Sequence, residues 1–142
     1  MRTDLLAGSL FALLALPQAP AHAEPNLGLS NRLQCQRRST PGRVVCEAEL
    51  EVETGVLAWA DVLVLEAPEF APPLRSRVGS SALFMKGPRR QRLQLALAAT
   101  AEGVGTLRVR ARVVHCPTAD QRNCRPMVKE AEASVLVGPI TE

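Results

Sequence analysis

The chain has 142 residues, a formal net charge of +3 and only 3% aromatic residues, with one Trp and no Tyr. This length suits one domain with a modest core. The basic residues, nearly all Arg, are balanced by acidic ones, and no aromatic side chains lie between them to stack on bases. We therefore expect no nucleic-acid partner.

The amino-terminal segment has the three parts of a secretory signal peptide. Arg2 supplies the charge, residues 5–16 form a short apolar core, and Ala21-His22-Ala23 is a small-x-small cleavage site. The apolar run is much shorter than the roughly 20 residues that a membrane span needs. We therefore predict a signal peptide at 1–23 and one domain at 24–142, periplasmic or secreted and not membrane-spanning.

Four cysteines follow the signal peptide, which is typical of an oxidising compartment and two disulfides. Three pairings are possible. We predict Cys35–Cys46 and Cys116–Cys124, because each pair brackets a short polar loop.

The segment from Val44 to Glu53 alternates apolar residues with glutamates, the period of a half-buried strand. The glutamates need solvent or arginine partners, and we expect Arg37 and Arg38 to supply them. The alternative is a cation site such as calcium, although glutamates in a row on a strand do not converge on one ion.

The next segment, Val56 to Leu65, is apolar on both sides, as in a central strand. We expect Trp59 to anchor the core. Asp61 interrupts the run, either as a buried carboxylate with partners or as the mark of a bulge.

The proline-rich stretch from Glu66 to Ser81 predicts a long surface loop, and such loops often carry binding residues. The alternative is that this stretch only connects two strands and binds nothing. The candidate binding residues are Phe70, Leu74, Arg75 and Arg77.

Residues 89–100 are ambiguous, since their Ala and Leu content favours a helix whereas their alternation favours a strand. We predict a strand.

The most informative stretch is residues 106–137, which predicts an antiparallel hairpin. If Cys116 lies opposite Cys124, Arg110 falls opposite Glu130 and Arg108 opposite Glu132, and the apolar sets share the other face. The cysteines then lie on the arginine side. With about seven short strands, the chain predicts an all-β, immunoglobulin-like antiparallel β-sandwich.

Catalytic patterns are almost absent. The predicted mature chain has one histidine, His115, no nucleophile elbow and no phosphate-binding glycine loop. A zinc site from His115, Cys116 and Cys124 is disfavoured, because neighbouring residues on a strand point to opposite sides. We expect no metal and no cofactor.

A strand ending in Cys116, a short polar loop, and Cys124-Arg125-Pro126 leading into a closing strand resemble the amino-terminal periplasmic domain of the DsbD thiol:disulfide interchange proteins. The resemblance implies an immunoglobulin-like fold in which Cys116 and Cys124 form a redox pair. It covers about a quarter of the chain and lacks that family's tyrosine cap.

Three functions follow as hypotheses. The first is a binding module with a protein partner in the periplasm or outside the cell, without catalysis and with both disulfides structural. The second is thiol–disulfide exchange at Cys116 and Cys124. The third is inhibition of an extracellular enzyme, with residues 70–78 as the bait loop.

Overall fold

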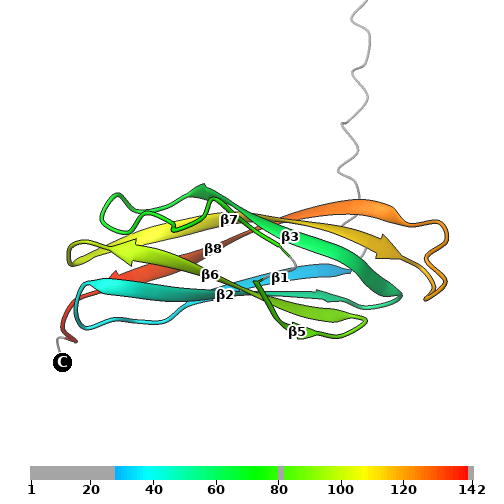
Figure 1. The fold of residues 1–142 in the computed structure, drawn as a ribbon, viewed down its shortest axis with the longest axis horizontal. Helices are drawn as coiled ribbons and strands as arrows, with labels where there is room; N and C mark the ends of the chain where they lie inside the picture. The colour runs from blue at the N-terminus through cyan, green and yellow to red at the C-terminus, as the bar shows by residue number, and fades with distance from the viewer. Residues whose placement is uncertain (1–27, 80–81, 141–142) are drawn as a thin grey trace, which may run out of the picture.

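The computed structural model describes residues 28–79 and 82–140, and within them the chain is all β (Figure 1). The predicted signal peptide lies outside these residues. No helix in the described part is long and apolar enough to cross a membrane. The strands are β1 (Leu29–Cys35), β2 (Gly42–Val52), β3 (Val56–Glu66), β4 (Arg77–Val78), β5 (Leu83–Lys86), β6 (Arg90–Ala99), β7 (Gly103–Cys116) and β8 (Arg125–Val137).

The strands form two four-stranded antiparallel sheets that pack face to face. One sheet has the order β1-β2-β6-β5 and the other β4-β3-β7-β8. This order matches the ABED and C′CFG sheets of an immunoglobulin-like sandwich, with β4 as a short C′ strand. The predicted fold class is confirmed, with eight described strands in place of about seven.

The β7–β8 hairpin has the register that its sequence predicts. Arg110 pairs with Glu130 and Arg108 with Glu132, while Leu107, Val109, Ala111 and Val113 are buried between the sheets. A shift by one residue would expose this apolar set, so the alternation fixes the register.

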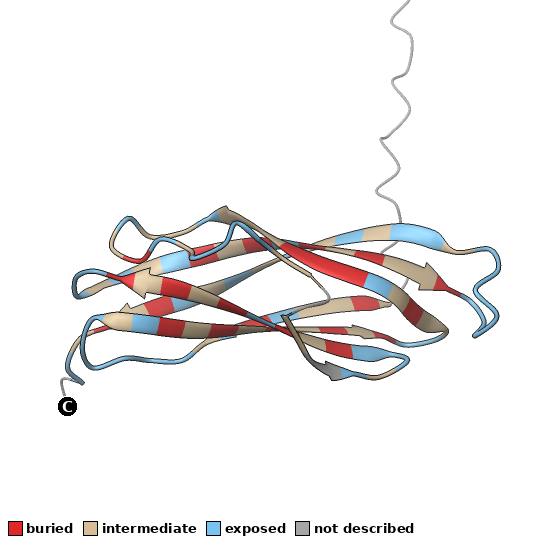
Figure 2. Cartoon of the chain, in the orientation of Figure 1, coloured by how far each residue is buried: buried red, intermediate tan, exposed pale blue. Residues whose placement is uncertain are grey.

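Burial alternates along β2 and β6, the central strands of one sheet (Figure 2). In β6, Leu93, Leu95 and Leu97 are buried and the residues between them are not. The strand prediction for residues 89–100 is confirmed. Helical propensity is a weak preference here, because pairing with β2 along ten residues and burial of one face outweigh it.

Trp59 is not a core anchor, contrary to the prediction. The register of β3 against β7 shifts between Leu57 and Trp59. This irregularity leaves Leu57, Ala60 and Val62 buried and places Trp59 on the outer face, where it is 40% exposed.

Both predicted disulfides are present, and each lies within one sheet. Cys35 and Cys46 are directly opposite each other on β1 and β2, and Cys116 and Cys124 close the β7–β8 hairpin. An antibody domain would join β2 to β7 across the core instead. Cys46 belongs to the core cluster, so the first disulfide fixes β1 to the centre of its sheet.

Candidate binding site

The segment between β3 and β5 is not a free surface loop. Leu74 N–H donates to the Ala96 carbonyl (2.9 Å), and Ala98 N–H donates to the Pro72 carbonyl (2.8 Å). Further along, Val64 N–H donates to the Ser76 carbonyl, and β4 pairs with β3. The segment is thus bonded first to β6 of one sheet and then to β3 of the other, which fixes its side chains.

Phe70, the first candidate binding residue, is half-buried against the start of β7. A Cβ atom at Gly103 would lie 2.7 Å from the Phe70 ring, and one at Gly105 would lie 2.6 Å from Pro68. The absence of side chains at these two glycines therefore allows the segment to approach the strand closely. This position gives Phe70 a packing role, and binding through it stays a prediction.

Arg77 lies at the other end of the segment and bonds to Asp61. The Asp61 side chain has no solvent-exposed surface, although it lies on the outer side of β3. Arg77 Nε donates to Asp61 Oδ2 at 2.6 Å, and Arg112 on β7 binds both carboxylate oxygens. The Arg112 hydrogen bonds, together with Arg77, lower the pKa of Asp61 against the opposing effect of burial. Asp61 is thus a satisfied buried carboxylate that links β3, β4 and β7.

Leu74 and Arg75 differ from these two residues because they line a hollow of about 420 Å³. We call it the Arg43–Arg75 hollow. Leu74 is 56% exposed. Neither Arg43 nor Arg75 has a carboxylate within ion-pair distance in the described part of the chain. The hollow is lined by Arg43, Val45, Leu74, Arg75, Val78, Ala82, Leu83, Gln94, Leu95 and Ala96.

The hollow lies at the point along β6 where the neighbouring element changes from β5 to the segment between β3 and β5. β5 pairs with β6 up to Leu93. From Ala96 onward, β6 is instead bonded by residues 72–74 of the segment between β3 and β5, which we call the crossing segment. Gln94 and Leu95 lie between these two partners and line the hollow. Leu74 and Arg75 were predicted from the sequence, whereas Arg43 and Ala96 were not, because the β2–β6 pairing brings them to this place.

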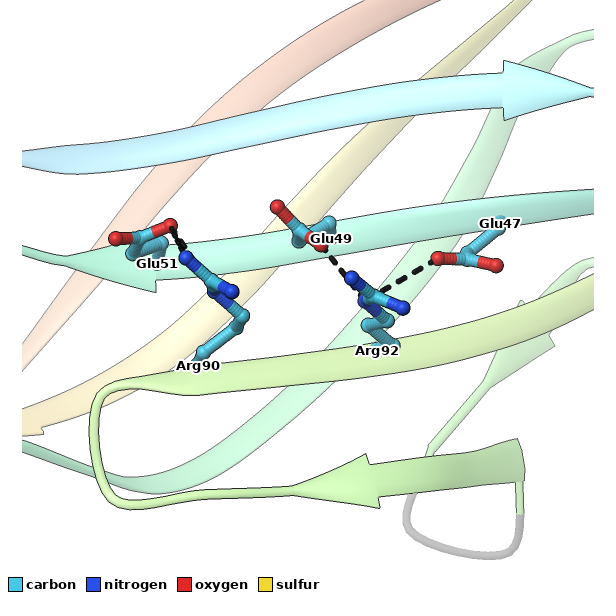
Figure 3. A network of polar contacts seen from close by, with 5 residues as sticks. All are labelled: Glu47, Glu49, Glu51, Arg90 and Arg92. Atoms are coloured by element: carbon cyan, nitrogen blue, oxygen red, sulfur yellow. Dashed lines mark hydrogen bonds and ion pairs between the residues drawn. The ribbon is translucent and has the colours of Figure 1, made fainter.

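The glutamate face of β2 is neutralised from β6, which was not predicted (Figure 3). Arg92 Nε lies 2.7 Å from Glu49 and 3.4 Å from Glu47, and Arg90 lies 3.0 Å from Glu51. The expected partners, Arg37 and Arg38, lie near the carboxyl end of β8 instead, where Arg37 donates to the Pro139 carbonyl and Arg38 pairs with Val137.

The arginines explain why these glutamates are a poor cation site. Each of Glu47, Glu49 and Glu51 already has a guanidinium partner, and Arg32 lies opposite Glu49 on β1. The residues that the structure describes include no group of three or more metal-ligating side chains.

The Cys116–Cys124 hairpin is less solvent-exposed than its sequence suggests. Cys116 is completely buried and only Cys124 is partly exposed. Of the nearby cations, Arg112 bonds to Asp61 and Arg122 lies 3.5 Å from Asp120. The predicted place of the cysteines on the arginine side thus does not make Cys116 accessible, and Arg112 and Arg122 already have acidic partners.

His115 makes a local structural contact. Its Nε2 lies 2.7 Å from the Thr54 carbonyl, so this nitrogen carries the hydrogen and donates. Gly55, with φ of +76°, lies directly beneath the ring, where a Cβ atom would be 2.6 Å from Nε2. The imidazole thus holds the β2–β3 turn against the end of β7, and the cysteines beside it are bonded to each other.

Comparison with known proteins shows no family for this chain. No protein-family model and no curated protein matches the chain. Among solved structures, the ASH/PapD-like domain of human CEP192 (PapD-like domain 7) is 10% identical, with a TM-score of 0.43 over 91% of this chain and 99% of that one. BslA, a bacterial hydrophobin, is 13% identical, with a TM-score of 0.34 over 80% of this chain and 97% of that one. Neither likeness bears on what this chain binds.

Proposed function

We propose that the protein is a non-catalytic binding module that uses the Arg43–Arg75 hollow to hold a protein segment with acidic and apolar side chains. The observation that carries the proposal is the pair of arginines, without carboxylate partners in the described part, that line the same hollow as the exposed Leu74. Nearly every other arginine on the outer faces of the central strands already bonds to an acid.

The chemistry of the hollow determines the class of ligand. Two guanidinium groups beside one opening raise the local positive potential and bind carboxylates through paired N–H donors. Leu74, Val45 and Ala96 line the same hollow and supply apolar surface. Arginine is enriched at protein interfaces, whose centres are more apolar than the rest of the surface.

The two disulfides support the proposed compartment. Two disulfides in one domain of this size are typical of an oxidising environment. Together with the signal-peptide pattern at residues 1–23, they support a periplasmic or secreted location for the domain.

A peptide titration tests the hollow directly. We expect an acetylated peptide of alternating Glu and Leu to shift the backbone amide NMR signals of Val45, Leu83 and Ala96 at millimolar concentration. A matched Lys–Leu peptide should leave these signals unchanged, because it places ammonium groups against two arginines. In the Arg43→Glu/Arg75→Glu variant, the preference between the peptides should reverse. Equal shifts with both peptides, or shifts elsewhere only, would contradict the proposal.

Photo-cross-linking then identifies the natural partner. A photoreactive residue at position 74 should give a discrete adduct in the host's extracytoplasmic fraction, whereas the same residue at the exposed Val104 on the other sheet should not. The adduct should disappear in the Arg43→Glu/Arg75→Glu background. An adduct that persists in that background would show that the hollow does not select the partner.

Thiol–disulfide exchange is the second candidate, supported by one observation. Cys124 is the more exposed cysteine of its pair and lies beside the exposed Arg125, so an attacking thiolate has access to one sulfur. The buried Cys116 would then be the leaving group.

Redox titration separates the two candidates. If the bond is structural, we expect Cys116–Cys124 to stay oxidised until the potential falls below about −300 mV, as is usual for structural disulfides. Mass spectrometry of alkylated protein after equilibration in glutathione and then in dithiothreitol buffers measures this. Reduction within the glutathione range, about −180 to −260 mV, would favour exchange instead.

A further inference from the structure

The connection between β1 and β2 carries cations close to the Arg43–Arg75 hollow. Arg37 and Arg38 lie in this loop, Arg43 follows at the start of β2, and all three are exposed. The first disulfide closes a ring that contains these three arginines. The loop lies at the end of the sandwich where β8 also ends (Figure 1). We call Arg37, Arg38, Arg43 and Arg75 the basic end.

The backbone of this loop is fixed by bonds to the other sheet. Arg38 N–H donates to the Leu136 carbonyl (3.1 Å), and Gly138 N–H donates to the Arg38 carbonyl (2.8 Å). The Arg37 guanidinium donates to the Pro139 carbonyl at 3.4 Å. A ligand that binds here therefore has to order only the arginine side chains, which lowers the entropic cost of binding.

The cations of the loop and of the hollow adjoin each other at the start of β2. Arg38 Nη2 would lie 3.4 Å from a Cβ atom at Gly42, the residue directly before Arg43. Arg43 lines the hollow together with Arg75. The arginine pair of the hollow is thus part of a larger group of cations at one end of the molecule.

The basic end is not neutralised within the described residues. None of its four arginines has a carboxylate within 4 Å there. Glu102, in the β6–β7 turn, lies near this end, where its Oε2 would be 3.6 Å from a Cβ atom at Gly138. The potentials of neighbouring like charges add, because screening at physiological salt acts over about 8 Å.

We infer that the protein segment held in the hollow continues as a run of acidic residues over the basic end. This inference rests on the proposed function, since the hollow holds the first part of the segment. The carboxylates that follow contact Arg38 and Arg37. A protein segment fits better than an anionic membrane, because Leu74 and Val45 line the hollow and individual side chains can enter it, whereas a lipid surface cannot.

Peptides with and without an acidic extension test the inference. The short probe is an acetylated Glu–Leu–Glu–Leu amide, and two long probes add three glutamates to its amino or its carboxyl end. Control peptides carry three glutamines in place of these glutamates. One of the long probes should bind about 3- to 10-fold more tightly than its glutamine control, since each partly exposed charge pair contributes a few-fold at most.

The position of the extension can be read from backbone amide NMR signals. The long probe that binds more tightly should shift the signals of Ser39 and Thr40 in the β1–β2 loop, and the short probe should not. If neither long probe exceeds its glutamine control, the inference is overturned.

Two charge-matched variants locate the contact. Arg37→Gln/Arg38→Gln should abolish the gain from the glutamates and leave the dissociation constant of the short probe nearly unchanged. Lys86→Gln/Arg89→Gln removes the same charge at the opposite end of β6 and should retain the gain. A gain that persists without Arg37 and Arg38, or that is lost equally in both variants, contradicts the inference.

The short probe separates this inference from the proposed function. If the short probe shifts the signals of Val45 and Ala96 but the glutamates add nothing, only the acidic extension is wrong. If neither the short nor the long probes shift these two signals, the proposed function is wrong as well.

Removing the nearby carboxylate tests whether the gain is electrostatic. Glu102→Gln should tighten binding of the long probe by about 2-fold, because it removes a like charge from the path of the ligand. The gain from the glutamates should also decrease at high salt. A gain that responds to neither change would not come from the arginines.

Co-sedimentation with phosphatidylglycerol vesicles tests the membrane alternative. At physiological salt, the wild type should bind these vesicles no better than Arg37→Gln/Arg38→Gln does. Vesicle binding that this variant abolishes, and that the long probe does not displace, would assign the basic end to an anionic membrane and overturn the inference.

Discussion

Replacing Arg77 and Arg112 together by Met should lower the free energy of unfolding by about 3–5 kcal/mol, the usual result of leaving a buried charge without its partners. Asp61 has no exposed surface, and these two arginines are its only hydrogen-bond partners in the described part of the chain. Asp61→Asn should have a smaller effect, because the two guanidinium groups are 58% and 40% exposed and water can solvate them. Urea denaturation at pH 7 measures both differences.

The same variants differ in their pH dependence. The wild-type pKa of Asp61 is lowered, so its stabilisation is complete above the unfolded pKa of about 4 and is lost as the pH falls through the lower folded pKa. In the variant without the two arginines, burial of the Asp61 carboxyl is no longer opposed and raises its pKa in the folded state. The Arg77→Met/Arg112→Met variant should therefore recover stability relative to the wild type between pH 7 and pH 4. If the difference in unfolding free energy between the variant and the wild type did not change across this range, Asp61 would not be charged in the native protein.

Arg108→Met is the matched control for these measurements. Arg108 lies on the same strand face as Arg112, but its ion pairs of 3.6 and 3.7 Å join exposed groups. Such pairs contribute about 1 kcal/mol or less. A loss as large as that of the double variant would mean that removing any arginine from β7 disturbs the sheet.

Removing the Cys35–Cys46 disulfide by changing both residues to Ala should cost about 3–5 kcal/mol. Closing a loop over a separation of 11 residues contributes about 3 kcal/mol in the chain-entropy description. Cys46 is fully buried in the core cluster, so loss of its sulfur also leaves a small cavity. We expect the melting temperature to fall by more than about 10 °C, as calorimetry can measure.

The Cys116→Ala/Cys124→Ala variant is the internal comparison. Its loop closes over a separation of eight residues, and Cys116 is buried outside the core cluster. The expected loss is about 2.5 kcal/mol. If this loss exceeded that at Cys35–Cys46, the hairpin end and not β1 would be the more critical attachment.

Local periodicity was sufficient to predict most of the fold. The β7–β8 register was predictable because three sets of residues, the cysteines, the outer charges and the inner apolar residues, agree on one pairing. The strand at residues 89–100 was predictable because its leucines alternate and can be buried only on one side. The disulfide partners followed from short loops between strands that pair directly.

The candidate site depends on contacts between strands that are far apart in the sequence. The Arg43–Arg75 hollow joins β2, β6 and the crossing segment, and no spacing in the sequence indicates that Arg43 and Arg75 share one opening. In the same way, Arg90 and Arg92 neutralise the β2 glutamates because β6, and not the preceding turn, lies beside β2. The row of glutamates on β2 could be predicted from the sequence. Their partners on β6 could be predicted only from the order of the strands in the sheet.

The sequence by itself determined most of the residues that face the core and the register of the β7–β8 hairpin, because both depend on alternation within a few residues. Only the tertiary structure decided which outward residues meet across strands distant in sequence. One irregularity in β3 turned Trp59 to the surface, and the packing of β4 and β7 around β3 made Asp61 a buried, doubly bonded carboxylate. Asp61 bonds to residues 16 and 51 positions away, and Trp59 pairs with Val114 on a strand still further along the chain; periodicity carries no signal at such separations.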